Sequence, residues 1–305
     1  MTQTVAAPAS SRPLHGVLWM LAAGLVFVVM TALVKALGPR IPAPQAAFLR
    51  YAMGLIFLLP MLRPILNTRF TPKVMGLFAL RGLLHSGGVM LWFFAMTRIP
   101  LAELTALNYL SPIFVTIGAA LFLKEHLAFR RIAAIGVALL GAVVILRPGF
   151  REIEPGHLAM LIAATVFSGS YLLAKVLTDQ ISPAVVVSML SVWVTLGLAP
   201  FAAVVWVTPT ATELLMLLGV ACFATAGHYL MTLAMRAAPL TVTQPVTFLQ
   251  LVWATLMGVL LFHESVDFWV LVGAGMILAA ISFITWREAV LRRRNVTPPV
   301  TATKG

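Results

Sequence analysis

The sequence contains few charged residues. Asp, Glu, Lys and Arg make up 10% of its 305 residues, whereas hydrophobic residues make up 61%. A soluble domain carries about 25% charged residues, because charge covers the surface that faces water. The shortage of charge excludes an ordinary water-soluble domain and predicts an integral membrane protein.

The sequence also contains a single cysteine, Cys222. One cysteine excludes an internal disulfide and a cysteine-based metal cluster. Because Cys222 lies in an apolar run, we interpret it as a small packing residue. The chain has no HExxH, GxSxG or P-loop pattern and no pair of carboxylates within one apolar span. These absences argue against an enzyme, and no cofactor or metal is predicted.

Long apolar runs, in contrast, are abundant. A helix needs about 20 apolar residues to cross the hydrocarbon core of a bilayer. By this measure the sequence predicts an all-α membrane protein with ten spans, at residues 15–37, 44–62, 75–97, 102–123, 129–147, 157–177, 183–206, 212–236, 240–261 and 267–286.

The basic residues behind the net charge of +12 are unevenly distributed. We call the side of the membrane that holds the N-terminus side A and the other side B. Fourteen Lys and Arg residues fall in the loops and ends on side A, five fall on side B, and Arg50 and Arg81 lie inside spans. The positive-inside rule therefore places both termini in the cytosol of a bacterial-type inner membrane. Membrane lipid, and not nucleic acid, is the expected partner of this charge.

Two similar stretches reveal a repeat. The sequence AMTRIPL at 95–101 and the sequence AMRAAPL at 234–240 lie 139 residues apart. At the same shift Glu125 aligns with Glu264, and at a shift of 140 Lys35 aligns with Lys175. Apolar bias alone would not align Lys, Glu and Pro. The chain is therefore predicted to hold two five-helix units at 15–147 and 157–286, between a disordered N-terminus at 1–14 and a basic tail at 287–305.

Each repeat holds an odd number of spans, so the second copy is predicted to enter the membrane from the opposite face. Inverted repeats of this kind are typical of secondary transporters, in which the two halves rock about a central solute site. The twin stretches form the turn between the third and fourth helices of each half. Proline suits this turn because it starts a helix without needing a backbone donor.

The segment AMTRIPLAELTALNYLSPIFVTIGAALFLKEHLAFRRIAAIGVALLGAVVILRPG resembles the second part of an EamA-type repeat. The pattern has a Pro after the third helix, a Pro inside the fourth, a closing Glu, Gly in the fifth helix and a closing Pro. The chain as a whole resembles the drug/metabolite transporter superfamily. The stretches FLRY and LRGLL are similar to the branch of S-adenosylmethionine and riboflavin uptake carriers.

One departure from the pattern concerns the prolines of the fourth and ninth spans. Pro112 aligns with Leu251, and Pro245 aligns with Ala106. The two half-sites therefore differ, as expected for an asymmetric solute. The resemblance implies a central cavity lined by helices of both halves, including the first, third, fourth, sixth, eighth and ninth.

Polar and aromatic residues within the spans are the candidates for this cavity, because a polar group inside a membrane is costly and is usually functional. The candidate cavity residues are His85, Trp92, Glu103, Asn108, Tyr109, Tyr171, His228, Tyr229, Thr243, Gln244, Thr247 and Gln250. Each also has a structural interpretation: a satisfied core histidine, an amide between helices, or a carboxylate at a helix N-terminus. Glu103 and His228 are the candidates for proton coupling.

Two further groups of residues stand at the ends of spans. The first group can reach the membrane interface or place a charge in the cavity, and comprises Lys35, Arg50, Arg81 and Lys175. The second group has expected architectural roles at turns, breaks and helix ends, and comprises Pro100, Pro112, Glu125, Pro239, Pro245 and Glu264.

The sequence thus predicts a secondary active transporter of a small polar or amphipathic metabolite, such as S-adenosylmethionine or riboflavin. The alternatives are a metabolite or amino-acid exporter of the same fold and, more distantly, a membrane-embedded enzyme. The solute, the direction of transport, the coupling ion and the oligomeric state, a homodimer included, remain open.

Overall fold

A computed structural model describes residues 13–122, 128–238 and 240–296. In this part of the chain, ten helical segments are long and apolar enough to cross a membrane, which confirms the predicted all-α architecture. The elements are α1 (Pro13–Leu37), α2 (Ala43–Gly54), η1 (Leu55–Met61), α3 (Leu62–Leu66), α4 (Pro72–Met96), α5 (Leu101–Asn108), α6 (Ser111–Phe122), α7 (Phe129–Leu146), α8 (Pro155–Thr178), α9 (Pro183–Val204), α10 (Ala211–Ala237), α11 (Leu240–Thr247), α12 (Leu249–Phe262) and α13 (Phe268–Val296).

Some predicted residues lie outside the described part of the chain. They are Glu125, Pro239, most of the N-terminal segment, and the last nine residues of the tail at 297–305. The last span, predicted at 267–286, is found at Phe268–Glu288, and the helix that carries it, α13, continues to Val296. The basic run at 292–294 therefore belongs to a helix.

Three of the ten spans are built from more than one helical element. The second span runs through α2, η1 and α3, and its 3₁₀ segment contains Pro60. The fourth span is divided between α5 and α6 just before Pro112, and the ninth between α11 and α12 just after Pro245. Proline lacks the N–H group of a regular helix and crowds the preceding turn, which accounts for the break before Pro112 and for the 3₁₀ segment around Pro60. The break in the ninth span follows Pro245 by two residues.

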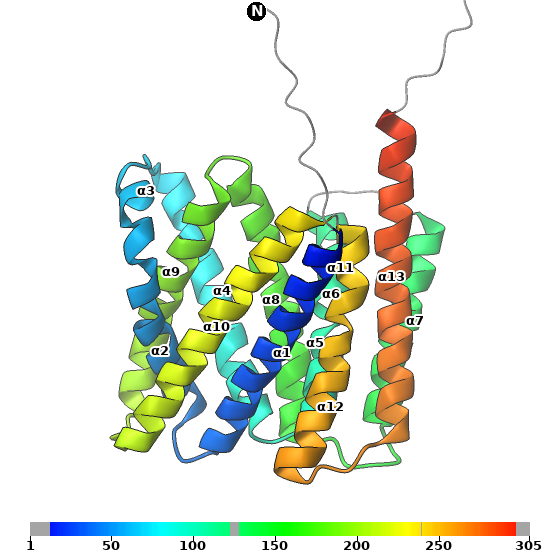
Figure 1. The fold of residues 1–305 in the computed structure, drawn as a ribbon, viewed down its shortest axis with the longest axis horizontal. Helices are drawn as coiled ribbons and strands as arrows, with labels where there is room; N and C mark the ends of the chain where they lie inside the picture. Colours follow the sequence, from blue (N-terminus) through cyan, green and yellow to red (C-terminus); the bar gives the residue numbers. More distant parts are fainter. Residues whose placement is uncertain (1–12, 123–127, 239, 297–305) are drawn as a thin grey trace, which may run out of the picture.

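The helices pack in pairs that join the two halves of the chain. α1 packs along α10, α4 packs along α8, and α7 packs along α13. Figure 1 shows α2 and α9 at one end of the bundle, α7 and α13 at the other, and the α1–α10 and α4–α8 pairs between them. The start of α1 and the end of α13 lie on the same face, side A. The middle of the bundle is therefore formed by helices from both halves.

Two glycines allow α7 and α13 to cross closely. A methyl group built on Gly141 would lie 2.6 Å from the carbonyl oxygen of Gly273, and a methyl group on Gly273 would meet the carbonyl oxygen of Gly141. Each contact is with rigid backbone, so the crossing depends on the absence of a side chain at both positions.

Replacing Gly141 by alanine is expected to lower the free energy of unfolding by about 1–3 kcal/mol, because overpacking forces the backbones apart. Gly136 lies on the same helix with nothing within 4 Å of its added methyl group. Gly136→Ala should therefore be neutral or raise stability by up to about 1 kcal/mol through helix propensity. The melting temperatures of both variants in detergent test this, and equal melting temperatures would contradict the close crossing.

Candidate functional site

A group of aromatic side chains surrounds His85 in the middle of the bundle. We call Tyr51, His85, Phe167 and Tyr171 the central aromatic cluster. The ring centre of His85 lies 4.9 Å from that of Phe167, 6.4 Å from that of Tyr51 and 6.5 Å from that of Tyr171. The two tyrosines meet the His85 ring nearly edge to face, an arrangement that aromatic rings favour. The cluster joins α2, α4 and α8, and therefore both halves of the chain.

His85 is held in place from α8. Its side chain is buried, and its Nδ1 lies 3.2 Å from the hydroxyl oxygen of Ser170. The hydroxyl can donate or accept, so this bond fixes the ring without fixing the tautomer. Since Ser170 follows the helix face that carries Phe167 and Tyr171, one face of α8 supplies three of the contacts of His85.

Two arginines accompany the cluster. Arg81 lies one turn before His85 on α4, is only 4% exposed, and donates a hydrogen bond of 2.8 Å to the carbonyl oxygen of Val186 on α9. The guanidinium carbon of Arg50 lies 4.0 Å from the ring centre of Tyr51, a cation–π contact. Both cations were predicted as charges near the ends of spans. The structure places them beside the aromatic cluster.

His228 approaches the same region from α10. Its ring meets Phe27 of α1 edge to face, with ring centres 5.1 Å apart. Its Nδ1 lies 2.7 Å from the carbonyl oxygen of Ala224 and must donate, because a carbonyl oxygen only accepts. In the neutral ring Nε2 is then an acceptor. Arg50 and His228 lie within electrostatic reach of His85.

The inner residues of α8 differ in exposure between its side-B and side-A ends. Along α8, Gly156, His157 and Met160 at the side-B end are buried. Towards side A, Tyr171 is 46% exposed and Lys175 is exposed as well. Tyr171 belongs to the central cluster, so the cluster is partly exposed at this side chain.

A buried group of charged residues lies at the side-B end. The Glu103 carboxylate, at the start of α5, accepts two hydrogen bonds from Arg151, of 3.0 Å and 2.6 Å. His157 Nε2 lies 2.5 Å from Glu103 Oε2, and the backbone N–H of Glu154 donates to His157 Nδ1 at 3.1 Å. Since Nδ1 accepts, Nε2 carries the hydrogen of the neutral ring and donates a hydrogen bond to Glu103. The hydrogen bond to Glu103 raises the pKa of Arg151 above its ordinary value.

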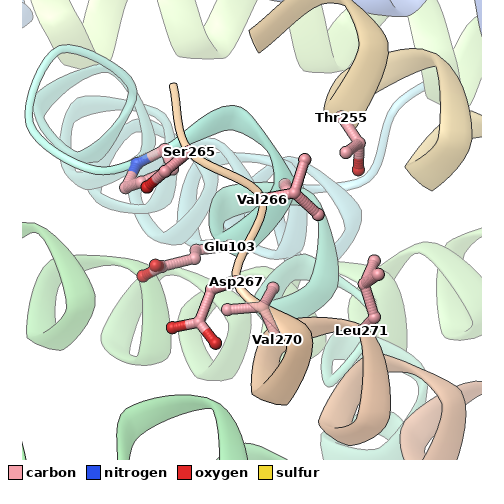
Figure 2. Close-up of a pocket in the computed structure, with 9 residues that line it drawn as sticks. Glu103, Thr255, Ser265, Val266, Asp267, Val270 and Leu271 are labelled. Atoms are coloured by element: carbon pink, nitrogen blue, oxygen red, sulfur yellow. The ribbon is translucent and has the colours of Figure 1, made fainter. Parts of the chain in front are cut away.

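Asp267 extends this group towards α13. Its carboxylate pairs with Arg147 and lies 3.7 Å from Arg151. Figure 2 shows Glu103 and Asp267 beside a small pocket that Val266 and Val270 also line. The pocket encloses about 10 Å³, which is room for about one water molecule and not for a metabolite. These residues therefore hold the side-B ends together and do not surround a solute site.

Glu264 makes a second connection at side B. Its carboxylate forms an ion pair with Lys35 of α1 and accepts a hydrogen bond of 2.9 Å from the backbone N–H of Leu101, at the start of α5. Lys35 also donates to the carbonyl oxygen of Ile99 at 2.8 Å. The Glu264 carboxylate, from the second half, thus connects α1 and α5 of the first half. It lies at the N-terminus of α5, where negative charge is favoured.

The loops at side B are joined as well. The Arg40 guanidinium pairs with Glu213, and this hydrogen bond raises the pKa of Arg40. The buried Gln45 amide donates to the carbonyl oxygen of Val207 at 2.6 Å and accepts from its N–H at 2.8 Å. A pocket of about 270 Å³ lies nearby, between the side-B ends of α1, α2 and α4. It is smaller than most ligand sites and contains none of the predicted cavity residues.

We call the contacts of Lys35, Arg40, Gln45, Glu103 and Asp267 with the other half of the chain the side-B network. On side A, an ion pair of 2.8 Å joins Arg131 to Glu288, between α7 and α13. The two halves are therefore joined by many polar contacts on side B.

The predicted cavity residues divide into several groups. His85 and Tyr171 meet in the central cluster, His228 lies near it, and Glu103 belongs to the side-B network. Tyr229 is 65% exposed. The remaining positions are half-buried Trp92, Asn108 and Gln250, the fully buried Thr243, and Gln244, whose side chain lies outside the described part.

Tyr109 connects the two interrupted spans. Its hydroxyl donates to the carbonyl oxygen of Thr247 at 3.1 Å, and its ring meets Phe248 with ring centres 6.0 Å apart. Thr247 ends α11 and Phe248 precedes α12. The breaks caused by Pro112 and Pro245 therefore touch each other, and the carbonyl freed at one break finds a partner at the other.

Several residues of the site were not singled out from the sequence. Tyr51 and Phe167 lie in apolar surroundings that give no polar pattern. Arg151 was counted as a side-B loop residue, and its partner Glu103 lies 48 residues away. One available signal was His157, three residues after Glu154 and two after a proline, which is the spacing of a helix N-terminal box.

Comparison with known proteins gives a family and a fold. The sequence model of the EamA-like transporter family matches residues 14–147 and 154–286. A solved structure superposes on the chain with a TM-score of 0.58 at 19% identity, covering 92% of this chain and 99% of its own. The chain and the solved structure therefore share a fold over nearly their whole length.

Named relatives are also similar over nearly their whole length. A riboflavin transporter of Rhizobium johnstonii is 30% identical over 295 residues, covering 94% of this chain and 96% of the relative. An S-adenosylmethionine uptake transporter of Rickettsia prowazekii is 26% identical over 285 residues, with 90% and 94% covered. A pseudopaline exporter of Pseudomonas aeruginosa is 26% identical over 267 residues, with 87% and 94% covered.

Proposed function

The chain belongs to the EamA-like transporter family, and from this premise we propose that it is a secondary carrier of a small polar or amphipathic metabolite. One observation carries the proposal beyond the family. Tyr171 of the central aromatic cluster is exposed, while the side-B network joins the two halves at the other end. A carrier must present its solute site to one side of the membrane at a time, and this arrangement corresponds to one such state.

Transport requires the opposite state as well. The side-B network would have to separate, while the contacts between α7 and α13 would serve as the base about which the halves move. The two five-helix units, proposed at 15–147 and 157–286, would rock against each other as inverted repeats. The pairing of α1 with α10 and of α4 with α8 supports this, because exchanging the two repeats exchanges these pairs.

Riboflavin and S-adenosylmethionine are the proposed candidate solutes, because similar proteins bear those names. Both contain a planar heterocycle, which suits a site built from Tyr51, His85 and Tyr171. Export remains the second candidate function, since a similar protein is named an exporter. Gradients of solute, protons or ions would set the direction, with Glu103 and His228 as the proposed proton carriers.

The carrier is a multi-pass membrane protein, and we place it in a bacterial-type inner membrane. Side A is proposed to be the cytosolic side because it carries most of the Lys and Arg residues. On this assignment the state described above faces the cytosol, and the side-B network faces the periplasm.

Ligand-induced stabilisation tests the proposal first. Purified carrier in detergent would be heated with riboflavin, S-adenosylmethionine, amino acids, nucleosides and carboxylates. A solute at 100 times its dissociation constant should stabilise the folded protein by about 2.7 kcal/mol. Uptake of the stabilising solute into liposomes containing the protein should then saturate with concentration. Binding without any uptake, together with chemical conversion of a lipid or solute, would favour a membrane-embedded enzyme and contradict the carrier.

A further inference from the structure

In the described part of the chain, the middle of the bundle carries positive charge and no carboxylate. The sequence has nine Asp and Glu residues, of which eight lie in the described part of the chain. Seven of these lie at helix ends or in loops (Glu103, Glu152, Glu154, Asp179, Glu213, Glu264 and Asp267), and Glu288 lies in α13, where it pairs with Arg131. Arg50 and Arg81, in contrast, lie inside spans beside the central aromatic cluster. A solute bound there therefore meets guanidinium groups and aromatic rings.

Arg81 is the more informative of the two cations. It is nine residues, about 14 Å, from the start of α4, which places it well inside the membrane. Its side chain is almost fully buried, yet Nε has no hydrogen-bond partner and the bond to Val186 is its one hydrogen bond in the described chain. No carboxylate of the described residues pairs with it. A buried arginine normally has an anionic or strongly accepting partner, so this site lacks one that a solute can supply.

The neighbours of Arg81 indicate the shape of that partner. Arg81 lies one turn before His85 on α4, and the rings of Tyr51 and Tyr171 both contact His85. Flat rings favour a planar aromatic solute, and a guanidinium favours oxygen acceptors in the plane of that solute. A cation in the same place would be repelled by both arginines, and no described carboxylate is there to neutralise it.

We propose that the central site selects planar aromatic solutes that are neutral or anionic and rejects cations. Arg81 would bind the ring-carbonyl or acidic oxygens of these solutes. The proposal rests on the carrier function proposed above. Of the two candidates above, riboflavin meets this description, because its ring system is uncharged and carries two carbonyl oxygens. S-adenosylmethionine carries a sulfonium cation next to its adenosine and does not meet it.

A matched pair of solutes tests the charge rule in the unmodified protein. S-adenosylhomocysteine keeps the adenosine and amino-acid parts of S-adenosylmethionine but has a neutral thioether in place of the sulfonium. Displacement of bound riboflavin, followed by its own fluorescence, should require at least about tenfold less S-adenosylhomocysteine than S-adenosylmethionine. Tighter or equal binding of S-adenosylmethionine overturns the inference, and so does the absence of riboflavin binding.

Variants of Arg81 test whether this residue binds the solute and rejects cations. Arg81→Gln should weaken riboflavin binding at least about tenfold and bring the two adenosyl compounds to similar affinities. Arg81→Lys should still reject S-adenosylmethionine, because it keeps the charge, but should bind riboflavin less well, because it lacks the planar fork. Arg98→Gln is the control, since Arg98 stacks on Phe94 at 3.6 Å and is exposed at side B. Unchanged riboflavin affinity in a folded Arg81→Gln protein overturns the inference.

Uptake into liposomes that contain the protein distinguishes a failure of the charge rule from a failure of the carrier function. Saturable uptake of S-adenosylmethionine or of a non-aromatic solute would overturn the charge rule and leave the carrier standing. Absence of uptake for every solute that binds would contradict the carrier itself.

Discussion

Replacing Glu264 by glutamine is expected to shift the protein from the state that is accessible at side A towards one that is accessible at side B. The Glu264 carboxylate joins the end of α12 to Lys35 and to the first N–H of α5. The Lys35 and Glu264 side chains are only 17% and 13% exposed. Removing one partner of a largely buried pair costs about 3–5 kcal/mol. Even one third of that changes a two-state equilibrium about tenfold.

A cysteine reporter measures this shift. Cys222 would first be replaced by serine, and Tyr171, which is exposed in the side-A state, by cysteine. A membrane-impermeant thiol reagent should label the reporter from side A in the parent, and Glu264→Gln should raise labelling from side B about tenfold. Adding Lys35→Met should reverse part of this change, because it removes the unpaired ammonium.

The control for this experiment is Glu288→Gln. It breaks the ion pair with Arg131 on side A, where the carboxylate is 43% exposed, so the expected effect is about 0–1 kcal/mol. Side-B labelling that stays at the parent level in Glu264→Gln would show that this carboxylate does not hold side B closed.

The fold could be predicted from the sequence because its determinants are local and periodic. Apolar runs of membrane length predicted ten spans, and ten are found in the described chain. Pro112 and Pro245 marked two of the three spans that are interrupted. The last membrane span was predicted at 267–286 and is found at Phe268–Glu288, and its helix continues through the basic run at 292–294, since arginine is a good helix former.

The site could be predicted only in part, because its contacts join residues far apart in the chain. His85 and Tyr171 stood out as polar groups in apolar spans, whereas Phe167, which packs between them, did not. Lys35 and Glu264 were each recognised as charges at helix ends. Their pairing depends on how α1 and α12 pack, which no local pattern contains.

Replacing Glu103 by glutamine is expected to lower the free energy of unfolding by about 3–5 kcal/mol. The carboxylate is 4% exposed and accepts two hydrogen bonds from Arg151 and one from His157. An amide of the same size keeps one acceptor, and its NH₂ group would face a donor of Arg151 or of His157. The melting temperature in detergent should therefore fall markedly. Glu152→Gln is the control. Glu152 is exposed in the loop that carries Arg151, and its replacement should change the melting temperature little.

Transport by the same variant separates anchoring from proton coupling. If Glu103 only anchors side B, Glu103→Gln loses stability and its uptake keeps the pH dependence of the parent. If Glu103 carries the coupled proton, uptake becomes independent of pH. Arg151 cannot produce such a dependence, because its raised pKa keeps it charged. Its contribution to stability is complete below its ordinary pKa and is lost only at strongly alkaline pH. A fully stable Glu103→Gln protein with pH-independent uptake would therefore assign Glu103 to the proton path and remove it from the side-B network.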